Sequence, residues 1–144
     1  MITQIFVNLP VKDLNESVEF FTKLVFTFNP QFTDENATCM IVGENMFVML
    51  LVEKFFKTFT KKEITDTTKN TEMIVALSAQ SREEVDQMMN KVLEAGGKES
   101  RAPQFQEDYA WMYGRYFEDL NGHLWHIFYM DESAMKKGWN VLPN

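Results

Sequence analysis

In two stretches of the chain, residues 5–11 and residues 73–79, an apolar set of residues occupies every second position. The sets are Ile5, Val7, Leu9 and Val11, which alternate with Phe6, Asn8 and Pro10, and Met73, Val75, Leu77 and Ala79, which alternate with Ile74, Ala76 and Ser78. A period of two predicts β-strands, because successive side chains of a strand point to opposite faces of a sheet. The two stretches superpose when position 6 is laid on position 74, an offset of 68 residues. This spacing predicts an internal repeat.

Each predicted strand leads into a predicted helix. Asp13 with Glu16, and Ser81 with Glu84, fit the capping box that satisfies the free N–H groups of a first helical turn. Apolar residues then recur at helical spacing, and Gly96 and Gly97 follow the second helix as a C-cap. The predicted core stripes are Leu14, Val18, Phe21 and Val25 in the first helix and Val85, Met88, Met89, Val92 and Leu93 in the second.

Two further strands are predicted in each half, at residues 38–42 and 46–51 and at residues 110–117 and 124–130. Turn residues separate the members of each pair, including Asn121-Gly122 in the second half. The predicted order is βαβββ, twice, and the pattern locates three of the four strands in each half. We therefore expect one domain over residues 1–144, made of repeat one (1–52), a connector (53–70), repeat two (71–131) and a C-terminal tail (132–144).

Composition narrows the class of protein. With 144 residues, 45% hydrophobic and 14% aromatic, the chain has enough apolar surface for one core. The single cysteine, Cys39, excludes an intrachain disulfide and is expected to be buried. A formal net charge of −7 disfavours binding to nucleic acid or to anionic membranes. The basic stretch Lys54–Lys62 is interpreted as an amphipathic connector.

No apolar run approaches the roughly 20 residues that span a bilayer, and the first ten residues lack the features of a secretory signal. We therefore expect a cytosolic protein.

The chain resembles a known family at both ends. Residues 6–14, 17–21 and 24–26 resemble the opening His-Val-x-Leu-x-Val-x-Asp-Leu, Ser-x-x-Phe-Tyr and Leu-Gly-Phe of vicinal oxygen chelate proteins. Residues 117–125 resemble their closing Phe-x-Asp-x-Asp-Gly-His-x-Trp hairpin. Val25 departs from the pattern, which often has glycine there. The resemblance implies an α+β fold in which two βαβββ repeats form a cupped mixed sheet with helices outside, as in glyoxalases and bleomycin resistance proteins.

The resemblance also implies four metal-ligand positions. They fall on Phe6, Ile74, Val48 (or Met49, one register away) and His126. Only His126 can ligate, and a divalent ion needs three or four nitrogen or oxygen ligands. We therefore expect no cofactor. A retained metal is the alternative, if the register differs or if Asn8, Glu44 or Asp119 acts as a ligand.

Without a metal, the cup is expected to bind a small molecule. If Tyr113, Arg115 and His126 share a face, as a two- or four-residue hairpin loop requires, Arg115 and His126 would bind an anion. Tyr113 or Phe6 would then stack on a planar group. A three-residue loop would instead place Met112, Gly114 and Tyr116 on that face. The predicted ligand contacts are Phe6, Asn8, Val48, Ile74, Tyr113, Arg115 and His126.

Each polar member of this set also has a structural interpretation. Arg115 would pair with Glu118 or Asp119, His126 would be a hydrogen-bonded core residue, and Asn8 would satisfy a strand edge. His123 is expected on the helix side or in the turn.

Three functions remain open. The first is metal-independent binding of a small anionic or aromatic molecule. The second is a metal-dependent glyoxalase-like lyase or isomerase, or a dioxygenase, with a metal-free variant in which His126 is the catalytic base. The third is a structural or protein-interaction domain. The family resemblance further implies a homodimer.

Overall fold

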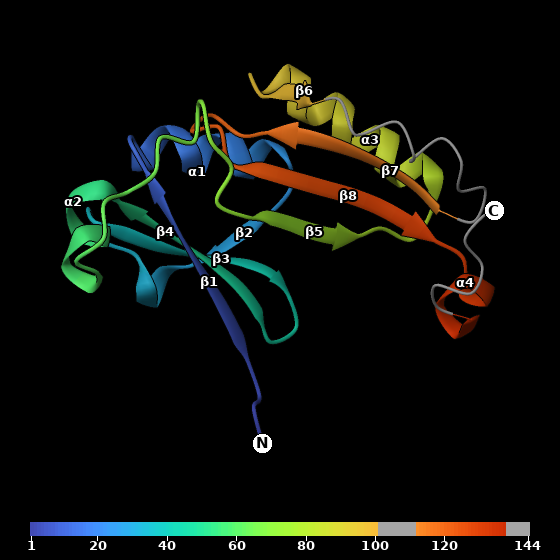
Figure 1. Cartoon of the computed structure of the whole chain (residues 1–144), viewed down its shortest axis with the longest axis horizontal. Coiled ribbons are helices and arrows are strands. Elements are labelled where there is room, and N and C mark those ends of the chain that lie inside the picture. Colours follow the sequence, from blue (N-terminus) through green and yellow to red (C-terminus); the bar gives the residue numbers. More distant parts are fainter. Residues whose placement is uncertain (101–111, 138–144) are drawn as a thin grey trace. The chain divides into compact units, whose positions relative to one another are not determined.

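The computed structural model describes residues 1–100 and 112–137. The chain forms two compact units, Met1–Asn70 and Thr71–Asn144, each with its own sheet (Figure 1). The strands are β1 (Ile5–Val11), β2 (Thr27–Asn29), β3 (Ala37–Gly43), β4 (Met46–Val52), β5 (Ile74–Ser78), β6 (Lys98–Ser100), β7 (Met112–Glu118) and β8 (Leu124–Met130). The helices are α1 (Leu14–Lys23), η1 (Pro30–Phe32), α2 (Glu53–Phe56), η2 (Lys57–Phe59), α3 (Arg82–Glu94) and α4 (Glu132–Lys137).

The two sheets have the same topology. Their strand orders are β1-β4-β3-β2 and β5-β8-β7-β6. In each sheet the first pair is parallel and the other two pairs are antiparallel. The predicted βαβββ order is therefore confirmed in both units. The pattern did not locate β2 and β6, and residues 110 and 111 of the strand predicted at 110–117 lie outside the described residues.

In the first unit, α1 starts at the predicted cap and covers one face of the sheet. The Asp13 carboxylate accepts a hydrogen bond from the Glu16 N–H at 2.9 Å. The sheet side of the core comes from one face of β1 and β4, and the helix side from α1 and the residue after it. The most buried members are Leu9, Val11, Phe20, Phe21, Leu24 and Leu50.

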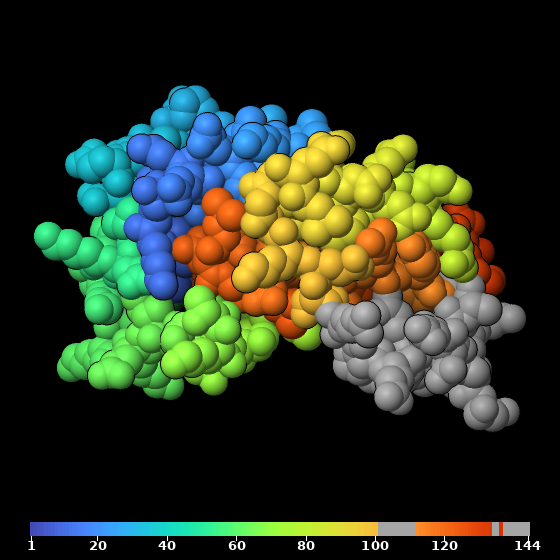
Figure 2. Space-filling model, turned by 90° about the horizontal axis from the view of Figure 1, so that it is seen from above, coloured from blue at the N-terminus to red at the C-terminus, as the bar shows by residue number. Residues whose placement is uncertain are grey.

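In the second unit, α3 packs against β6, β7 and β8. Ser81 caps the helix by accepting from the Glu84 N–H at 3.1 Å, while the Glu84 carboxylate accepts from the Gln80 N–H. Val85, Met89 and Val92 of the predicted stripe are buried, whereas Leu93 is 48% exposed, so its core assignment was wrong. Figure 2 shows the C-terminal half of α3 and β6, in yellow, at the surface of this unit.

The connector is partly helical, as α2 and η2. Its lysines Lys54 and Lys57 are exposed, and Phe55 and Phe59 pack edge to face at 5.1 Å. α2 contacts β1 and β4, so the connector is attached to the first sheet. Among the helices of residues 1–100 and 112–137, none has the length and apolar character needed to cross a bilayer.

Val25 does not continue the helical stripe as expected. The helix ends at Lys23, and Val25 adopts a φ of 73° with its side chain 67% exposed. Positive φ brings Cβ close to the backbone carbonyl, and a β-branched residue tolerates this poorly. The chain thus has the backbone conformation of a glycine at a position occupied by valine.

The loop between β7 and β8 is fixed by a buried carboxylate. Asp119 accepts hydrogen bonds from the backbone N–H groups of Asn121 and His123 at 2.9 and 3.1 Å and from Trp125 Nε1 at 3.0 Å. Asp119 and His123 also pair through their backbones, which leaves the three residues 120–122 inside the loop. Burial raises the pKa of Asp119, although these N–H groups favour its ionised form.

Replacing Val25 with glycine should stabilise the protein. The positive φ costs valine about 1–2 kcal/mol, while the added backbone freedom of glycine costs about 0.5–1 kcal/mol, so we expect a gain of roughly 1 kcal/mol in urea unfolding. Val25→Ala, which keeps Cβ, is the matched control and should not give this gain. A destabilised Val25→Gly variant would contradict the strain that we assign to this position.

Replacing Asp119 with alanine should destabilise the protein strongly. Three buried N–H groups would lose their common acceptor, and we expect a loss of about 2–4 kcal/mol in the free energy of unfolding. Asp66 provides the control, because it also accepts two hydrogen bonds in a turn, from Thr68, but is exposed. Asp66→Ala should cause a much smaller change in the same urea titration, and equal losses would show that burial of the Asp119 carboxylate is unimportant.

Candidate functional site

The register of β7 and β8 decides which side chains share a face of the second sheet. Tyr116 lies opposite His126, and Arg115 lies opposite Ile127. The favoured expectation, with Tyr113 and Arg115 beside His126, was therefore wrong, and the three-residue loop that the sequence left open is the one found. We call the face that carries His126 the His126 face. Its described members on the three longer strands are Ile74, Ala76, Ser78, Met112, Gly114, Tyr116, Glu118, Leu124, His126, Phe128 and Met130.

His126 is enclosed by aromatic rings. Its imidazole stacks on the Tyr116 ring, with centroids 4.0 Å apart and planes 2° apart, and Phe128 lies 5.2 Å away. The residue is only 9% exposed, and its buried Nε2 has no hydrogen-bond partner among the described residues. Burial lowers the pKa of His126, so the neutral imidazole is favoured. The expectation of a hydrogen-bonded core histidine fails at Nε2.

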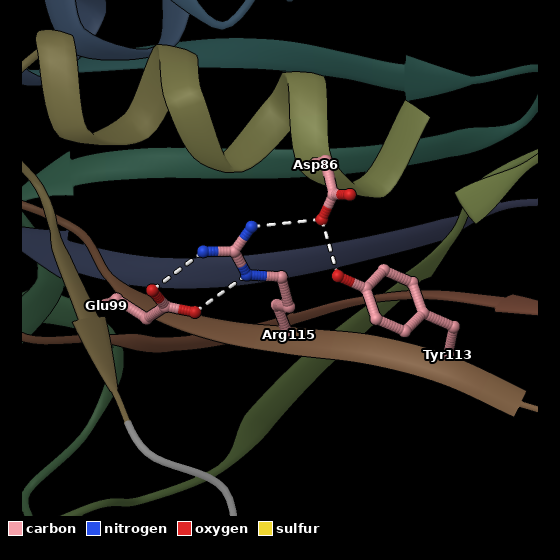
Figure 3. A network of polar contacts seen from close by, with 4 residues as sticks. All are labelled: Asp86, Glu99, Tyr113 and Arg115. Carbon is pink, nitrogen blue, oxygen red and sulfur yellow. Dashed lines mark hydrogen bonds and ion pairs between the residues drawn. The ribbon is translucent and has the colours of Figure 1, made fainter. Parts of the chain in front are cut away.

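Arg115 lies on the opposite face, between the sheet and α3, where it forms the network drawn in Figure 3. Its Nε and Nη2 donate to the two carboxylate oxygens of Glu99 at 2.7 and 2.8 Å, and its Nη1 donates to Asp86 at 3.0 Å. Glu99, together with Asp86, raises the pKa of Arg115 further above its ordinary value. The expected partners Glu118 and Asp119 were wrong, because Asp86 of α3 and Glu99 of β6 face Arg115.

Tyr113 belongs to the same network. Its hydroxyl donates to Asp86 at 2.5 Å, and Arg82 lies 5.4 Å above its ring. The bond to Asp86 raises the pKa of Tyr113 and lowers that of Asp86. Tyr113 and Arg115 therefore join α3 to the sheet, and neither lies on the same face of the sheet as His126.

The other histidine also lies away from the His126 face. His123 is 2% exposed in the β7–β8 loop, and its Nδ1 lies 2.7 Å from a Glu72 carboxylate oxygen. Trp125 and Ile127, which alternate with His126, are buried on the side that faces α3. His123 and Trp125 of the closing motif thus stabilise the hairpin, as expected for the turn and helix side.

The first sheet has a corresponding face, which we call the Phe6 face. Phe6 stacks on Phe47 at 4.7 Å, and Asn8 lies on the same side of β1. The Asn8 amide donates to the Phe6 carbonyl at 3.2 Å, the strand-edge role that was its structural interpretation. Val48 pairs with Val7 and is 2% exposed, so it lies on the other face.

The correction of Val48 follows from the pairing of β1 with β4. This parallel pair puts Met49, the alternative one register away, beside Asn8. The equivalent parallel pair of the second sheet, β5 with β8, puts His126 beside Ala76. Ala76 corresponds to Asn8 at the offset of 68 residues. Met49 therefore occupies in the first repeat the place that His126 occupies in the second. Cys39, opposite Met49, is buried as expected, and burial raises the pKa of its thiol.

Comparison with known proteins agrees with this architecture. A family model described as bleomycin resistance protein-like N-terminal matches residues 3–43. A hypothetical protein from S. aureus of known structure is 33% identical, with a TM-score of 0.74 over 90% of this chain and 95% of that one. No curated protein sequence matches this chain significantly.

Two further similar structures belong to proteins that are named as a glyoxalase-related enzyme and as an antibiotic resistance protein. A glyoxalase-related enzyme from Fulvimarina pelagi is 20% identical, with a TM-score of 0.70 over 89% of this chain and 88% of that one. The fosfomycin resistance protein FosX from Listeria monocytogenes, solved with Mn(II) and sulfate, is 17% identical, with a TM-score of 0.68 over 96% and 99%. The chain belongs to the vicinal oxygen chelate superfamily. Its predicted α+β fold of two βαβββ repeats is confirmed.

The metal positions of the vicinal oxygen chelate superfamily do not suit a metal in this member. In the first unit, Phe6 and Met49 offer no nitrogen or oxygen ligand, and in the second unit Ile74 offers none beside His126. Residues 1–100 and 112–137 contain no group of three or more His, Cys, Asp and Glu side chains placed to hold a metal. One imidazole does not hold a divalent ion.

The residue that sequence reasoning left out of its favoured site is Tyr116. It was named only for the three-residue loop, and its stack on His126 makes it part of the candidate site. The tyrosine and the histidine lie ten positions apart in a hairpin, so their contact depends wholly on the register.

His126 should titrate below the ordinary histidine value of about 6.5. Because its folded pKa is lowered, the unfolded chain binds the proton more readily, and its contribution to stability is lost as pH falls from about 6.5 through the folded pKa. The chain has two histidines, so ring NMR signals assigned with a His126→Phe variant would give the His126 titration directly. A midpoint at or above 6.5 would contradict the burial that we describe.

Proposed function

We propose that this member of the superfamily binds a small molecule on the His126 face without the help of a metal ion. One observation carries the proposal: a nine-tenths buried imidazole with a hydrogen-bonding atom that has no partner among the described residues. A buried polar atom without a partner costs about 1–3 kcal/mol. Such atoms are uncommon in structures, and a ligand that supplies the missing partner recovers that free energy.

The surroundings of His126 support binding of a small organic molecule. Tyr116 and Phe128 provide aromatic surface, and Ile74, on the same face, is 51% exposed. Small-molecule sites typically combine apolar and aromatic walls with few polar groups. The proposed contacts in the second unit are therefore Ile74, Tyr116 and His126. For the first sheet, taken by itself, Phe6 and Asn8 remain predicted ligand contacts.

A catalytic role of His126 remains a prediction. A neutral imidazole has a free lone pair and acts as a general base when a substrate proton lies within hydrogen-bond reach. The metal-dependent lyase or dioxygenase reaction is the alternative, and it requires ligands that the positions of Phe6, Met49 and Ile74 do not offer. We also propose a cytosolic location. We further propose that the protein is a homodimer, which sedimentation analysis of the purified protein would test.

The two histidines make the proposal directly measurable. We expect compounds from a library of small ring molecules to shift the ring NMR signals of His126 and to leave those of His123, held near Glu72, unchanged. Such compounds should also raise the midpoint of thermal unfolding, because a ligand that binds only the folded state stabilises it. Elemental analysis of the untagged protein, before and after incubation with Ni²⁺, Zn²⁺, Mn²⁺ and Fe²⁺, should show no stoichiometric metal.

Matched variants on the two faces of β7 and β8 provide the control. His126→Phe keeps a stacked ring but removes the nitrogen, and should abolish binding. Tyr113→Phe removes a hydroxyl on the α3 side and should leave binding unchanged. Stoichiometric metal that is lost in His126→Phe would overturn the metal-independent proposal in favour of the enzyme alternative. Equal weakening by both variants would show that the ligand does not bind on the His126 face.

A further inference from the structure

We infer that the ligand of the His126 face is an uncharged planar ring compound that carries a hydrogen-bonding group, and that carboxylates and phosphates are excluded. This inference rests on the proposed function and specifies the chemical class of its ligand. It depends on the arrangement of small and aromatic residues on the face, on the placement of its charges, and on the unpartnered nitrogen of His126.

The arrangement of side chains on this face is suited to a flat molecule. Along one row, β5 contributes Ala76, β8 contributes His126 and β7 contributes Tyr116. The next row contains Ser78, Phe128 and Gly114 in the same order. Small side chains thus lie on β5, next to the aromatic rings of β8, and Ala76 and Ser78 are exposed. A planar ring therefore has room over β5, beside the positions of His126 and Phe128.

The described charges of the face do not favour an anion. Lys98 is two strands away from His126, and its register neighbour on β7 is Glu118. Arg115 lies on the α3 side, bound to Glu99 and Asp86. An anion placed against His126 would lose its hydration without gaining a cation from the described residues of this unit, and burial of an unpaired charge is strongly unfavourable. An uncharged ring does not bear this cost.

The hydrogen-bonding group follows from the chemistry of a neutral imidazole. One ring nitrogen then donates and the other accepts, so an amide or a hydroxyl group, each of which both donates and accepts, satisfies Nε2 in either tautomer. A ring N–H does so only in the tautomer in which Nε2 is the acceptor. Because Nε2 is shielded from solvent, a ligand atom reaches it only when a neighbouring group turns aside. Water does not compete for a nitrogen that is shielded in this way, which increases the value of a single ligand hydrogen bond.

Matched pairs of neutral and anionic ring compounds test the inference. We would titrate benzamide against benzoate, and nicotinamide against nicotinate, at pH 7.5, following the ring signals of His126 and, in the His126→Phe variant, the midpoint of thermal unfolding. The neutral member of each pair should bind at least about tenfold more tightly, a difference of about 1.4 kcal/mol. Ala76→Ile should weaken binding of the neutral compounds by a similar factor, because it fills the space over β5 with a residue that suits a strand. Tyr113→Phe on the other face should not.

The outcomes separate the ligand class from the existence of the site. Tighter binding of the anions, or equal binding of both members, with His126 still required, would overturn the inference and leave the proposed function in place. Failure of all four compounds to shift His126, together with failure of the wider library, would overturn both. Binding of the neutral compounds that is unaffected by both His126→Phe and Ala76→Ile would place them elsewhere and also overturn the inference.

Discussion

The buried carboxylate of Asp119 is the interaction on which the second unit depends. By accepting hydrogen bonds from three N–H groups, the Asp119 carboxylate closes the loop between β7 and β8, which has an odd number of residues. Side chains alternate along a strand, so a loop one residue longer or shorter would exchange the two faces of β7. The observed loop puts Tyr116 against His126 and turns Arg115 toward α3. Both the stacked pair and the ionic network of Figure 3 are consequences of this one turn.

Most of the fold could be predicted from the sequence because its elements are long enough to show a period. β1, β5 and both long helices lie where alternation, helical spacing and capping residues placed them. The three-residue strands β2 and β6 could not be found in this way, since three residues define no period. Val25 was misassigned for a related reason. It fits the helical stripe, but the positive φ needed after the helix is not visible in hydrophobicity.

The candidate site was harder to predict than the fold, and the errors share a cause. A shift of one residue in the strand register placed three predicted contacts on the wrong face, namely Val48, Tyr113 and Arg115. The faces of the other four did not depend in this way on the length of a hairpin loop: Phe6, Asn8, Ile74 and His126. The partners of Arg115 add a second difficulty. Asp86 and Glu99 precede it by 29 and 16 residues, and only the packing of α3 and β6 on β7 brings them to it. Local charge patterns pointed instead to Glu118 and Asp119.

The two repeats have different side chains at corresponding places, Met49 in the first and His126 in the second, and this difference suggests a reason for the imidazole. Met49 occupies the corresponding place in the first sheet, and it provides apolar contact without a group that requires a partner. A phenyl ring at position 126 would keep the stack on Tyr116 without a buried nitrogen that lacks a partner. The imidazole therefore reduces the stability of the free protein relative to such a ring, by about 1–3 kcal/mol. Proteins tend to keep a residue that packs poorly or lacks a hydrogen-bond partner where a functional site requires that side chain. With no second nitrogen or oxygen ligand at the superfamily's metal positions in this unit, the imidazole suits the ligand hydrogen bond or the general-base role that we propose for His126 better than it suits metal binding.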